Sequence, residues 1–382
     1  MPSSRTNSKW LRLTLAVGAL FALAVRIGYR QPEPARQSPA ATAASPPAAA
    51  TATTHSEEKS DHTLQDACQA LRLESNTQIT RQKLAELRKV LSSMPRSAAV
   101  AAIRRFLDSK ADAATRLGFK LASNGMLDEA PTLRTFLLDE LGRLDPAAAA
   151  DYSKTVLASM DSADEWAVAL RNLALGDASA DGRSLLQQKT TQMLQYGPWQ
   201  QNPSVGFLES FDVPVYLGGT DFLPTLSELV RSQDNPAVAH AAFLALDRLV
   251  VNNPATVLQS LENDPNLMTG RESTRADYFA RANVSDPQQR QVLESYLLNP
   301  SITPAELQTF AGVYPNVNYM ISPNLLTSTP MPTHESLMNL DAQALAAAQQ
   351  WLDDPRFANV APVLQTITHR LEGLATQAKP GN

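Results

Sequence analysis

The feature that most constrains the fold is a series of Asp-Pro and Asn-Pro dipeptides along the chain. They include Asp145-Pro146, Asn235-Pro236, Asn253-Pro254, Asp264-Pro265, Asp286-Pro287, Asn299-Pro300 and Asp354-Pro355. An Asp or Asn side chain accepts hydrogen bonds from the free N–H groups of a first helical turn, and proline suits the first helical position. Because the residue before a proline is disfavoured in the α region, any preceding helix must already have ended. The dipeptides therefore predict short helices joined by tight connections.

Between these dipeptides, apolar residues recur at spacings of three and four, which is typical of amphipathic helices. In the stretch 162–173, Ser162 is placed to cap a helix, acidic residues follow in the first turn, and apolar residues repeat at i, i+4 and i+7. Comparable stretches lie at 84–91, 103–107, 222–230, 238–251, 256–261, 274–282, 288–297, 305–310, 341–352 and 360–374. No alternating run of β-branched residues is long enough to predict a strand. We therefore expect an all-α fold.

One segment, 235–254, carries a more specific pattern. Its features are the openings Asn235-Pro236 and Asn253-Pro254, the small Ala237, Ala241 and Ala242, and the series Leu244, Leu246 and Leu249. In these features it resembles a helical hairpin of the HEAT/armadillo type. The resemblance implies stacked helix pairs, each too small to bury its own apolar face alone. Since no constant period runs through the chain, we predict an irregular α-solenoid, with a non-repetitive orthogonal helical domain as the alternative.

An uncharged, largely apolar run at 13–25 lies between basic residues near the amino terminus. Counted from Trp10 to Tyr29, the run reaches the roughly 17–25 residues that cross a bilayer as a helix. This length requires Arg12 and Arg26 to extend towards the lipid head groups. The aromatic residues at the two ends suit the membrane–water interfaces. The pattern predicts a membrane anchor that contacts the lipid bilayer through residues 10–29.

A cleaved secretory signal is the alternative interpretation of residues 1–30. A processing site needs small residues soon after the apolar run, but the first Ala-rich stretch begins at Ala40. We therefore favour an uncleaved signal-anchor segment over 1–30. The positive charge before the run would keep the amino terminus in the cytoplasm. The Ala-rich sequence that follows is of a bacterial kind, so we predict a single-pass inner-membrane protein with its body in the periplasm.

Residues 31–60 contain five Pro and nine Ala but no Ile, Leu, Val, Phe, Tyr or Trp, so nothing there can form a core. We predict a disordered Ala/Pro-rich tether at 31–60 and an α-helical, repeat-like domain at 61–382. Residues 1–60 carry seven basic and three acidic side chains, a net charge of +4, whereas the rest carries 26 basic and 35 acidic side chains, a net charge of −9. A body of that sign repels phosphate backbones, which excludes nucleic acid as a partner.

Two stretches, 196–219 and 313–332, interrupt the helical pattern and are rich in turn-forming residues and aromatics. Long segments without helices are uncommon in compact domains unless they are functional or disordered, and aromatic content argues against disorder. We expect both stretches to be non-helical and to lie across the helices. Their aromatic side chains are the candidate anchors for a protein partner. These candidates are Trp199, Phe211, Tyr216, Tyr314 and Tyr319.

The sequence carries no phosphate-binding loop, no Gly-x-Ser-x-Gly and no complete His-Glu-x-x-His motif. His334-Glu335 begins the last of these, but Met338 stands where the second histidine is needed. Cys68 and His240 lie in predicted helices and are interpreted as parts of the helical packing. A single cysteine also excludes a disulfide framework and a multi-thiolate zinc site. We therefore predict no catalytic residue, no metal site and no cofactor.

Together these features favour a membrane-anchored, extracytoplasmic helical scaffold that binds another protein. A helical periplasmic enzyme of the hydrolase class is one alternative, because all-α active sites can lack short motifs. A foldase-like chaperone is another, since lipase-specific foldases share the plan of anchor, tether and helical body. Their Arg-x-x-Phe-Asp-Tyr motif is absent from this chain. Whether a small molecule binds is left open.

Overall fold

The computed structural model describes residues 62–232, 234–318, 322–328 and 331–377, all of which belong to one compact unit. Residues 62–72 are helical. The helices that follow are α2 (Thr77–Ser93), α3 (Arg96–Asp108), α4 (Leu133–Leu144), α5 (Pro146–Val156), α6 (Ala163–Gly176), α7 (Ala180–Leu194), α8 (Gly197–Gln201), α9 (Val205–Glu209), α10 (Asp212–Leu217), α11 (Leu223–Arg231), α12 (Pro236–Asn252), α13 (Pro254–Asn263), α14 (Glu272–Phe279), α15 (Pro287–Leu298), α16 (Pro304–Val313), α17 (His334–Leu352) and α18 (Ala361–Gln377), with 3-10 helices η1 (Pro265–Met268) and η2 (Pro355–Val360). The all-α prediction is confirmed.

All the Asp-Pro and Asn-Pro dipeptides except Asn299-Pro300 open an α-helix or a 3-10 helix, although Asn253 opens α13 without a side-chain cap. Asp145, Asn235 and Asp286 each accept hydrogen bonds from N–H groups in the first turns of α5, α12 and α15. Asn299 instead ends α15, and its side chain accepts a hydrogen bond from the Ser301 N–H in the turn that follows. The next helix, α16, begins only at Pro304, where Thr303 supplies the cap. A local capping signal thus located most helix starts correctly.

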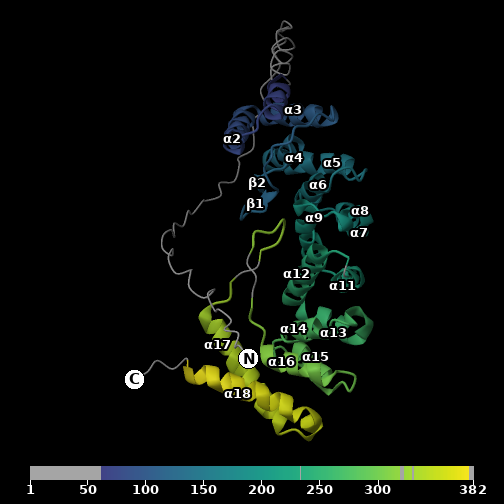
Figure 1. Cartoon of the computed structure of the whole chain (residues 1–382), viewed down its shortest axis with the longest axis vertical. Coiled ribbons are helices and arrows are strands. Elements are labelled where there is room, and N and C mark those ends of the chain that lie inside the picture. Colours follow the sequence, from purple (N-terminus) through teal and green to yellow (C-terminus); the bar gives the residue numbers. More distant parts are fainter. Residues whose placement is uncertain (1–61, 233, 319–321, 329–330, 378–382) are drawn as a thin grey trace, which may run out of the picture. The chain divides into compact units, whose positions relative to one another are not determined.

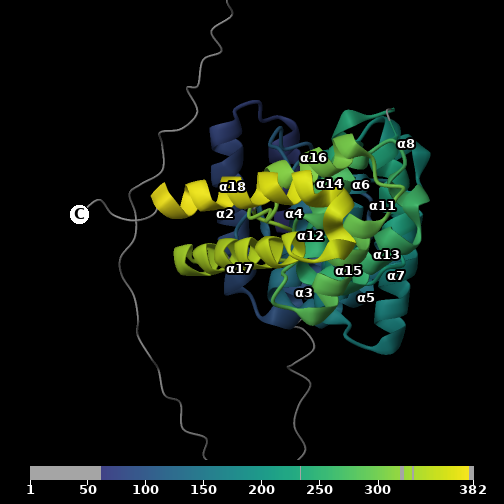
Figure 2. The same ribbon diagram turned by 90° about the horizontal axis from the view of Figure 1, so that it is seen from below.

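From α4 to α16 the helices pack in two rows (Figure 1). In the first row α4 packs on α6, α6 on α9, α9 and α10 on α12, and α14 on α16. Tyr278 of α14 joins this row to α12 by donating a hydrogen bond to the Phe243 carbonyl. The second row holds α5, α7, α11, α13 and α15, which cover the first row from one side. Figure 2 shows α17 and α18 side by side, and α18 packs on α16.

Arginine–carboxylate pairs join successive segments of the first row. The pairs are Arg134–Glu165, Arg171–Asp139, Arg248–Asp212, Arg281–Asp247 and Arg275–Glu306. In each pair the two residues lie 31 to 36 positions apart in the chain. Buried ion pairs add little net stability, but leaving one partner alone is costly, so they favour one arrangement of the helices over others.

The segment between α16 and α17 forms no helix in its described part, as predicted for 313–332. We call its residues 314–318 and 322–328 the strap. The strap lies along the first row (Figure 1), where the Asn316 N–H donates to the Ala280 carbonyl just after α14. Further on, the N–H groups of Leu326 and Thr327 donate to Asp212 at the start of α10. Leu325, only 1% exposed, is part of the core.

Two expectations about local structure were wrong. The stretch 196–219 was expected to be non-helical but forms α8, α9 and α10. Pro198 and Pro214 stand in the first turns of α8 and α10, where the missing N–H is not needed, and Pro203 precedes Ser204, which caps α9. A short antiparallel hairpin, β1 (Lys120–Leu121) with β2 (Leu127–Glu129), was not foreseen. The dipeptide Asn124-Gly125 in its turn is a typical hairpin signal, and Gly125 has a positive φ of 76°.

The predicted membrane placement needs correction. Among the described residues, no helix combines the length and the apolar character needed to cross a bilayer. The 19-residue α17, for example, carries His334, Glu335 and Asp341, and such polar groups are costly in hydrocarbon. The structure therefore does not support a single-pass inner-membrane protein with a periplasmic body. The anchor predicted at 10–29 and the tether at 31–60 lie outside the described residues.

Candidate functional site

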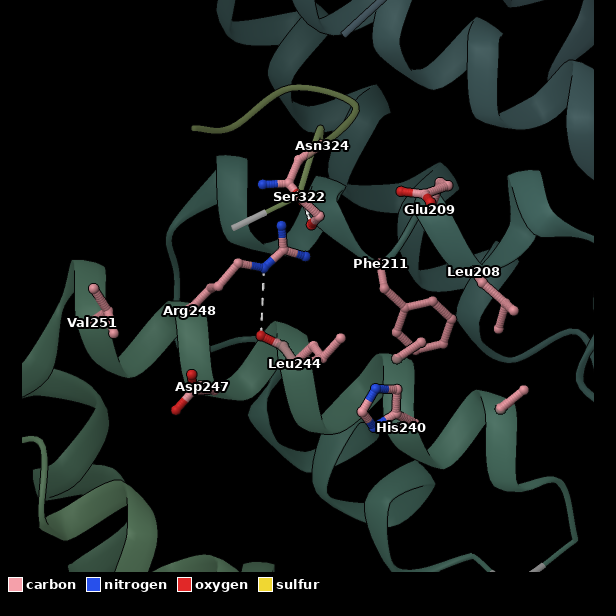
Figure 3. A pocket seen from close by; sticks show the side chains of 12 residues that line it. Leu208, Glu209, Phe211, His240, Leu244, Asp247, Arg248, Val251, Ser322 and Asn324 are labelled. Carbon is pink, nitrogen blue, oxygen red and sulfur yellow. Dashed lines mark hydrogen bonds between the residues drawn. The ribbon is translucent and has the colours of Figure 1, made fainter. Parts of the chain in front are cut away.

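A pocket of about 230 Å³ lies between α9, α10 and α12, beside the strap (Figure 3). Leu208 and Glu209 from the end of α9, with Phe211 just after it, line one side. Ser322 and Asn324 of the strap line another. The walls are mostly apolar, and charged groups enter at a few places. The pocket therefore joins residues from three parts of the chain that are far apart in sequence.

Helix α12 supplies the remaining wall through one of its faces. These residues are Ala237, His240, Ala241, Leu244, Asp247, Arg248 and Val251, and they recur at spacings of three and four. Residues spaced in this way lie on one face of a helix. Another stripe of α12, with Val238, Ala242 and Leu249, is buried in the core. The helix thus uses one side for packing and turns a second, partly exposed side to the pocket.

Asp212, at the first position of α10, is the central polar group beside the pocket and is only 1% exposed. Arg248 Nη1 donates to its Oδ1 at 2.8 Å. The Leu326 and Thr327 N–H groups donate to its Oδ2 at 2.6 and 2.8 Å, and the Thr327 hydroxyl donates to Oδ1. Burying a carboxylate is costly unless it is paired and hydrogen-bonded, and both conditions are met. Asp212 therefore fixes the strap and Arg248 together.

Glu209 differs from Asp212 in having no partner. Within the described residues, no hydrogen bond or ion pair reaches its carboxylate, which lines the pocket (Figure 3). Burial raises the pKa of Glu209, and the attraction of Arg248 opposes this effect only in part. Arg248 is already bound to Asp212, and its Nε points to the Leu244 carbonyl at 3.4 Å. Glu209 is thus a half-buried carboxyl group whose charge has no direct counter-ion.

The other charged groups around the pocket are paired. Asp247 receives two hydrogen bonds from Arg281, and burial raises the pKa of Asp247. Three carboxylates, of Glu209, Asp212 and Asp247, therefore stand against two guanidinium groups, of Arg248 and Arg281. The local excess is one negative charge when Glu209 is ionised. Chemically, the pocket offers apolar walls and one anionic group that is open to a cation.

The structure does not gather the predicted aromatic anchors on one surface. Phe211 is 1% exposed and forms part of the pocket wall, and Tyr314 is buried and stacks on Phe310 with ring centroids 4.9 Å apart. Trp199 is half-buried, with edge-on contacts to Trp166 and other rings. Tyr216 is 38% exposed, and its hydroxyl donates to the Ala174 carbonyl. Tyr319 lies outside the described residues. Partner binding by these side chains stays a prediction.

Sequence reasoning did not single out the charged groups of the pocket. Glu209, Asp212 and Arg248 belong to different helices, and the Arg248–Asp212 pair spans 36 positions, so no short motif links them. The repeated arginine–carboxylate spacing along the first row was the one available signal. His240, interpreted as part of the helical packing, lies exposed at the pocket and stacks on Phe243.

The residues considered for nucleophilic or metal chemistry lie elsewhere. Cys68 is buried in the helix at 62–72, and burial raises the pKa of its thiol. His334 and Glu335 stand in the first turn of α17. Within the described ranges, no group of three or more His, Cys, Asp or Glu side chains is arranged to hold a metal ion. In comparisons with known proteins, no family model, no curated protein and no solved structure matches the chain.

Proposed function

We propose that the chain is a helical scaffold, an irregular α-solenoid of the HEAT type, whose first row binds extended segments of other proteins. Two features support the solenoid interpretation. Each first-row helix packs on a neighbour in the same row, and arginine–carboxylate pairs join successive helices at intervals of 31 to 36 residues. Solenoids present long surfaces on which extended partners bind. The function that we propose is therefore that of a protein-binding module.

The observation that carries the proposal is the way in which the strap is bound. The strap is a non-helical segment, held to α10 by two main-chain N–H groups that donate to Asp212. Its Leu325 side chain is buried, and the Leu325 carbonyl lies close to Gly125 of the hairpin turn. Peptide-binding proteins use the same combination, in which main-chain hydrogen bonds give affinity and side-chain pockets give specificity. The first row thus already holds one non-helical segment, from its own chain.

A selection from a library of random linear peptides displayed on phage, with the purified full-length chain as target, tests the proposal. The photo-crosslinker p-benzoylphenylalanine is placed at Ala237, an exposed first-row residue that lines the pocket. A matched variant carries it at Gln259, an exposed residue of α13 in the second row. We expect enriched peptides to crosslink from position 237 and not from position 259. The readout is mass spectrometry of the crosslinked products.

Two outcomes contradict the proposal. One is a selection without enrichment over an unrelated helical protein of similar charge. The other is enriched peptides that crosslink equally from both positions, because binding would then not depend on the first row.

A further inference from the structure

We propose that the pocket between α9, α10 and α12 binds one basic side chain, arginine or lysine, of an extended partner segment, with the Glu209 carboxylate as its counter-ion. This inference rests on the proposed function, since it names the chemistry of the partner. It assigns a binding role to a group that the packing of the protein leaves without a partner.

The size of the pocket suits a single side chain. Pockets that hold drug-sized ligands usually measure about 300–1,000 Å³, and this pocket measures about 230 Å³. Its location fits the same conclusion, because Ser322 and Asn324 of the strap form one wall. A partner segment that runs beside the strap on the first row passes the mouth of the pocket.

The charge around the pocket selects a cation. Arg248 is bound to Asp212 and Asp247 is bound to Arg281, so these four groups neutralise one another. Glu209 is left with no hydrogen bond or ion pair within the described residues. An acidic partner side chain would be repelled there, and a neutral one would leave the carboxylate desolvated and unpaired. A guanidinium or ammonium group restores the balance and forms charge-assisted hydrogen bonds.

The apolar walls fit the rest of such a side chain. Leu208, Phe211, Leu244 and Val251 line the pocket around the charged groups. Arginine and lysine bury their methylene stems against apolar surface while the charged end meets a polar partner. The burial that raises the pKa of Glu209 also strengthens its attraction for a cation, because water screens the charge less. Size, charge and wall chemistry thus agree on one kind of occupant.

The test uses small probes that need no peptide partner. Nα-acetyl-arginine N-methylamide is compared with its uncharged analogue built on citrulline, and Nα-acetyl-lysine N-methylamide with its Nε-acetylated form. Binding to the full-length chain is followed by NMR of assigned methyl groups of Leu208, Leu244 and Val251, which line the pocket. We expect titration of these methyl signals to show that at least one charged probe binds with about tenfold higher affinity than its neutral analogue. Neutral analogues that bind as well as both charged probes overturn the proposal.

The variant Glu209→Gln identifies the counter-ion. We expect the variant to lower the affinity for the charged probe about tenfold, to the level of the neutral analogue. The matched control Glu228→Gln changes an exposed glutamate of α11 in the second row and leaves the affinity unchanged. Methyl signals distant from the pocket report whether each variant keeps the native fold. A Glu209→Gln variant that is folded and binds the charged probe normally overturns the assignment.

The outcome of the probe titrations can be distinguished from the outcome of the peptide selection. If peptides bind the first row but the charged probes show no preference, the scaffold function stands and the basic-side-chain pocket fails. If the probes bind as expected but no peptide is enriched, the pocket stands and the scaffold function fails.

Discussion

Asp139 and Asp212 are two buried aspartates that hold a non-helical segment on the first row, and their surroundings differ. Asp139 accepts hydrogen bonds from the Leu127 N–H in the hairpin, from Arg171 and from Arg143. Arg171 is fully buried and also donates to the Gly125 carbonyl of the hairpin turn. Asp212 accepts hydrogen bonds from the strap and from Arg248, whose side chain is 18% exposed. In both places an arginine from the next helix of the row completes the network.

The difference lies in what borders each network. Around Asp139, the guanidinium of Arg171 is enclosed by protein. Around Asp212, the space next to Arg248 is a pocket with the unpaired Glu209 on its wall. The same device, a buried aspartate with an arginine, is thus enclosed by protein in one region. In the other it borders a place where a partner group can bind.

The largest effect is expected for Asp139→Ala. Removing this carboxylate leaves the buried Arg171 without a counter-ion, so the free energy of unfolding should fall by about 3–5 kcal/mol. Urea denaturation followed by circular dichroism measures the change. The control Asp151→Ala removes an exposed partner of Arg104 and should change stability little. Equal losses of unfolding free energy in the two variants would mean that pairing the buried Arg171 with Asp139 does not stabilise the fold as predicted.

Asp212→Ala should lower the free energy of unfolding by less, about 2 kcal/mol. Arg248 reaches water, and the strap amides become solvated when their acceptor is lost. We expect a local effect as well, namely faster hydrogen exchange of the Leu326 and Thr327 amides. Hydrogen-exchange mass spectrometry measures it, with Asp221→Ala, an exposed residue bound to Gln187, as control. Unchanged exchange in the strap would show that Asp212 does not hold it.

Gly125 lies where the two networks approach each other, because its carbonyl accepts from Arg171 and its Cα faces the strap. A Cβ at this position would lie 2.5 Å from the Leu325 carbonyl oxygen, and the φ of 76° disfavours any side chain. Gly125→Ala should therefore lower the free energy of unfolding by about 1–2 kcal/mol and speed up hydrogen exchange of the strap amides. Gly312→Ala, in α16 with open space around the site, should be neutral or stabilising. If both variants behave alike, the hairpin and the strap are not in contact in solution.

The smallest effect is expected for Glu209→Gln. Burial raises the pKa of Glu209 in the folded state, so the folded protein binds its proton more tightly than the unfolded chain does. Stability from this group is present at low pH and is lost as pH rises through the folded-state pKa. The variant should thus be more stable than the natural protein at neutral pH, by under about 1 kcal/mol, with no difference below about pH 4. Thermal melts at the two pH values test the sign, and a variant less stable at neutral pH would contradict it.

Local signals in the sequence predicted the helices better than the connections. Asp145, Asn235 and Asp286 cap helices as expected, because a cap and its first turn are a few residues apart. The prediction for the stretch 196–219 was wrong because Pro198 and Pro214 were interpreted as turn formers although they stand in the first turns of α8 and α10. The hairpin at 120–129 was too short for a pattern of alternating residues, although Asn124-Gly125 could have indicated it.

The pocket could not be predicted from the sequence. Leu326 and Asp212 lie 114 positions apart, and the pairing of such residues depends on how the intervening helices stack. Among the aromatic candidates, Phe211 and Tyr314 are buried. The sequence analysis missed this because composition gives no information on which side of a short helix faces the core.

By itself the sequence determined that this chain is helical and where most of its helices begin. Caps, prolines and apolar spacing act over one or two turns, so their effects do not depend on the rest of the molecule. Only the tertiary structure decided which of the three carboxylates around the pocket are paired and which one is not. Glu209 and Asp212 are three residues apart in the chain, yet Asp212 meets Arg248 and the strap while Glu209 faces the pocket. Their difference arises from contacts with segments that the packing of the helices brings together.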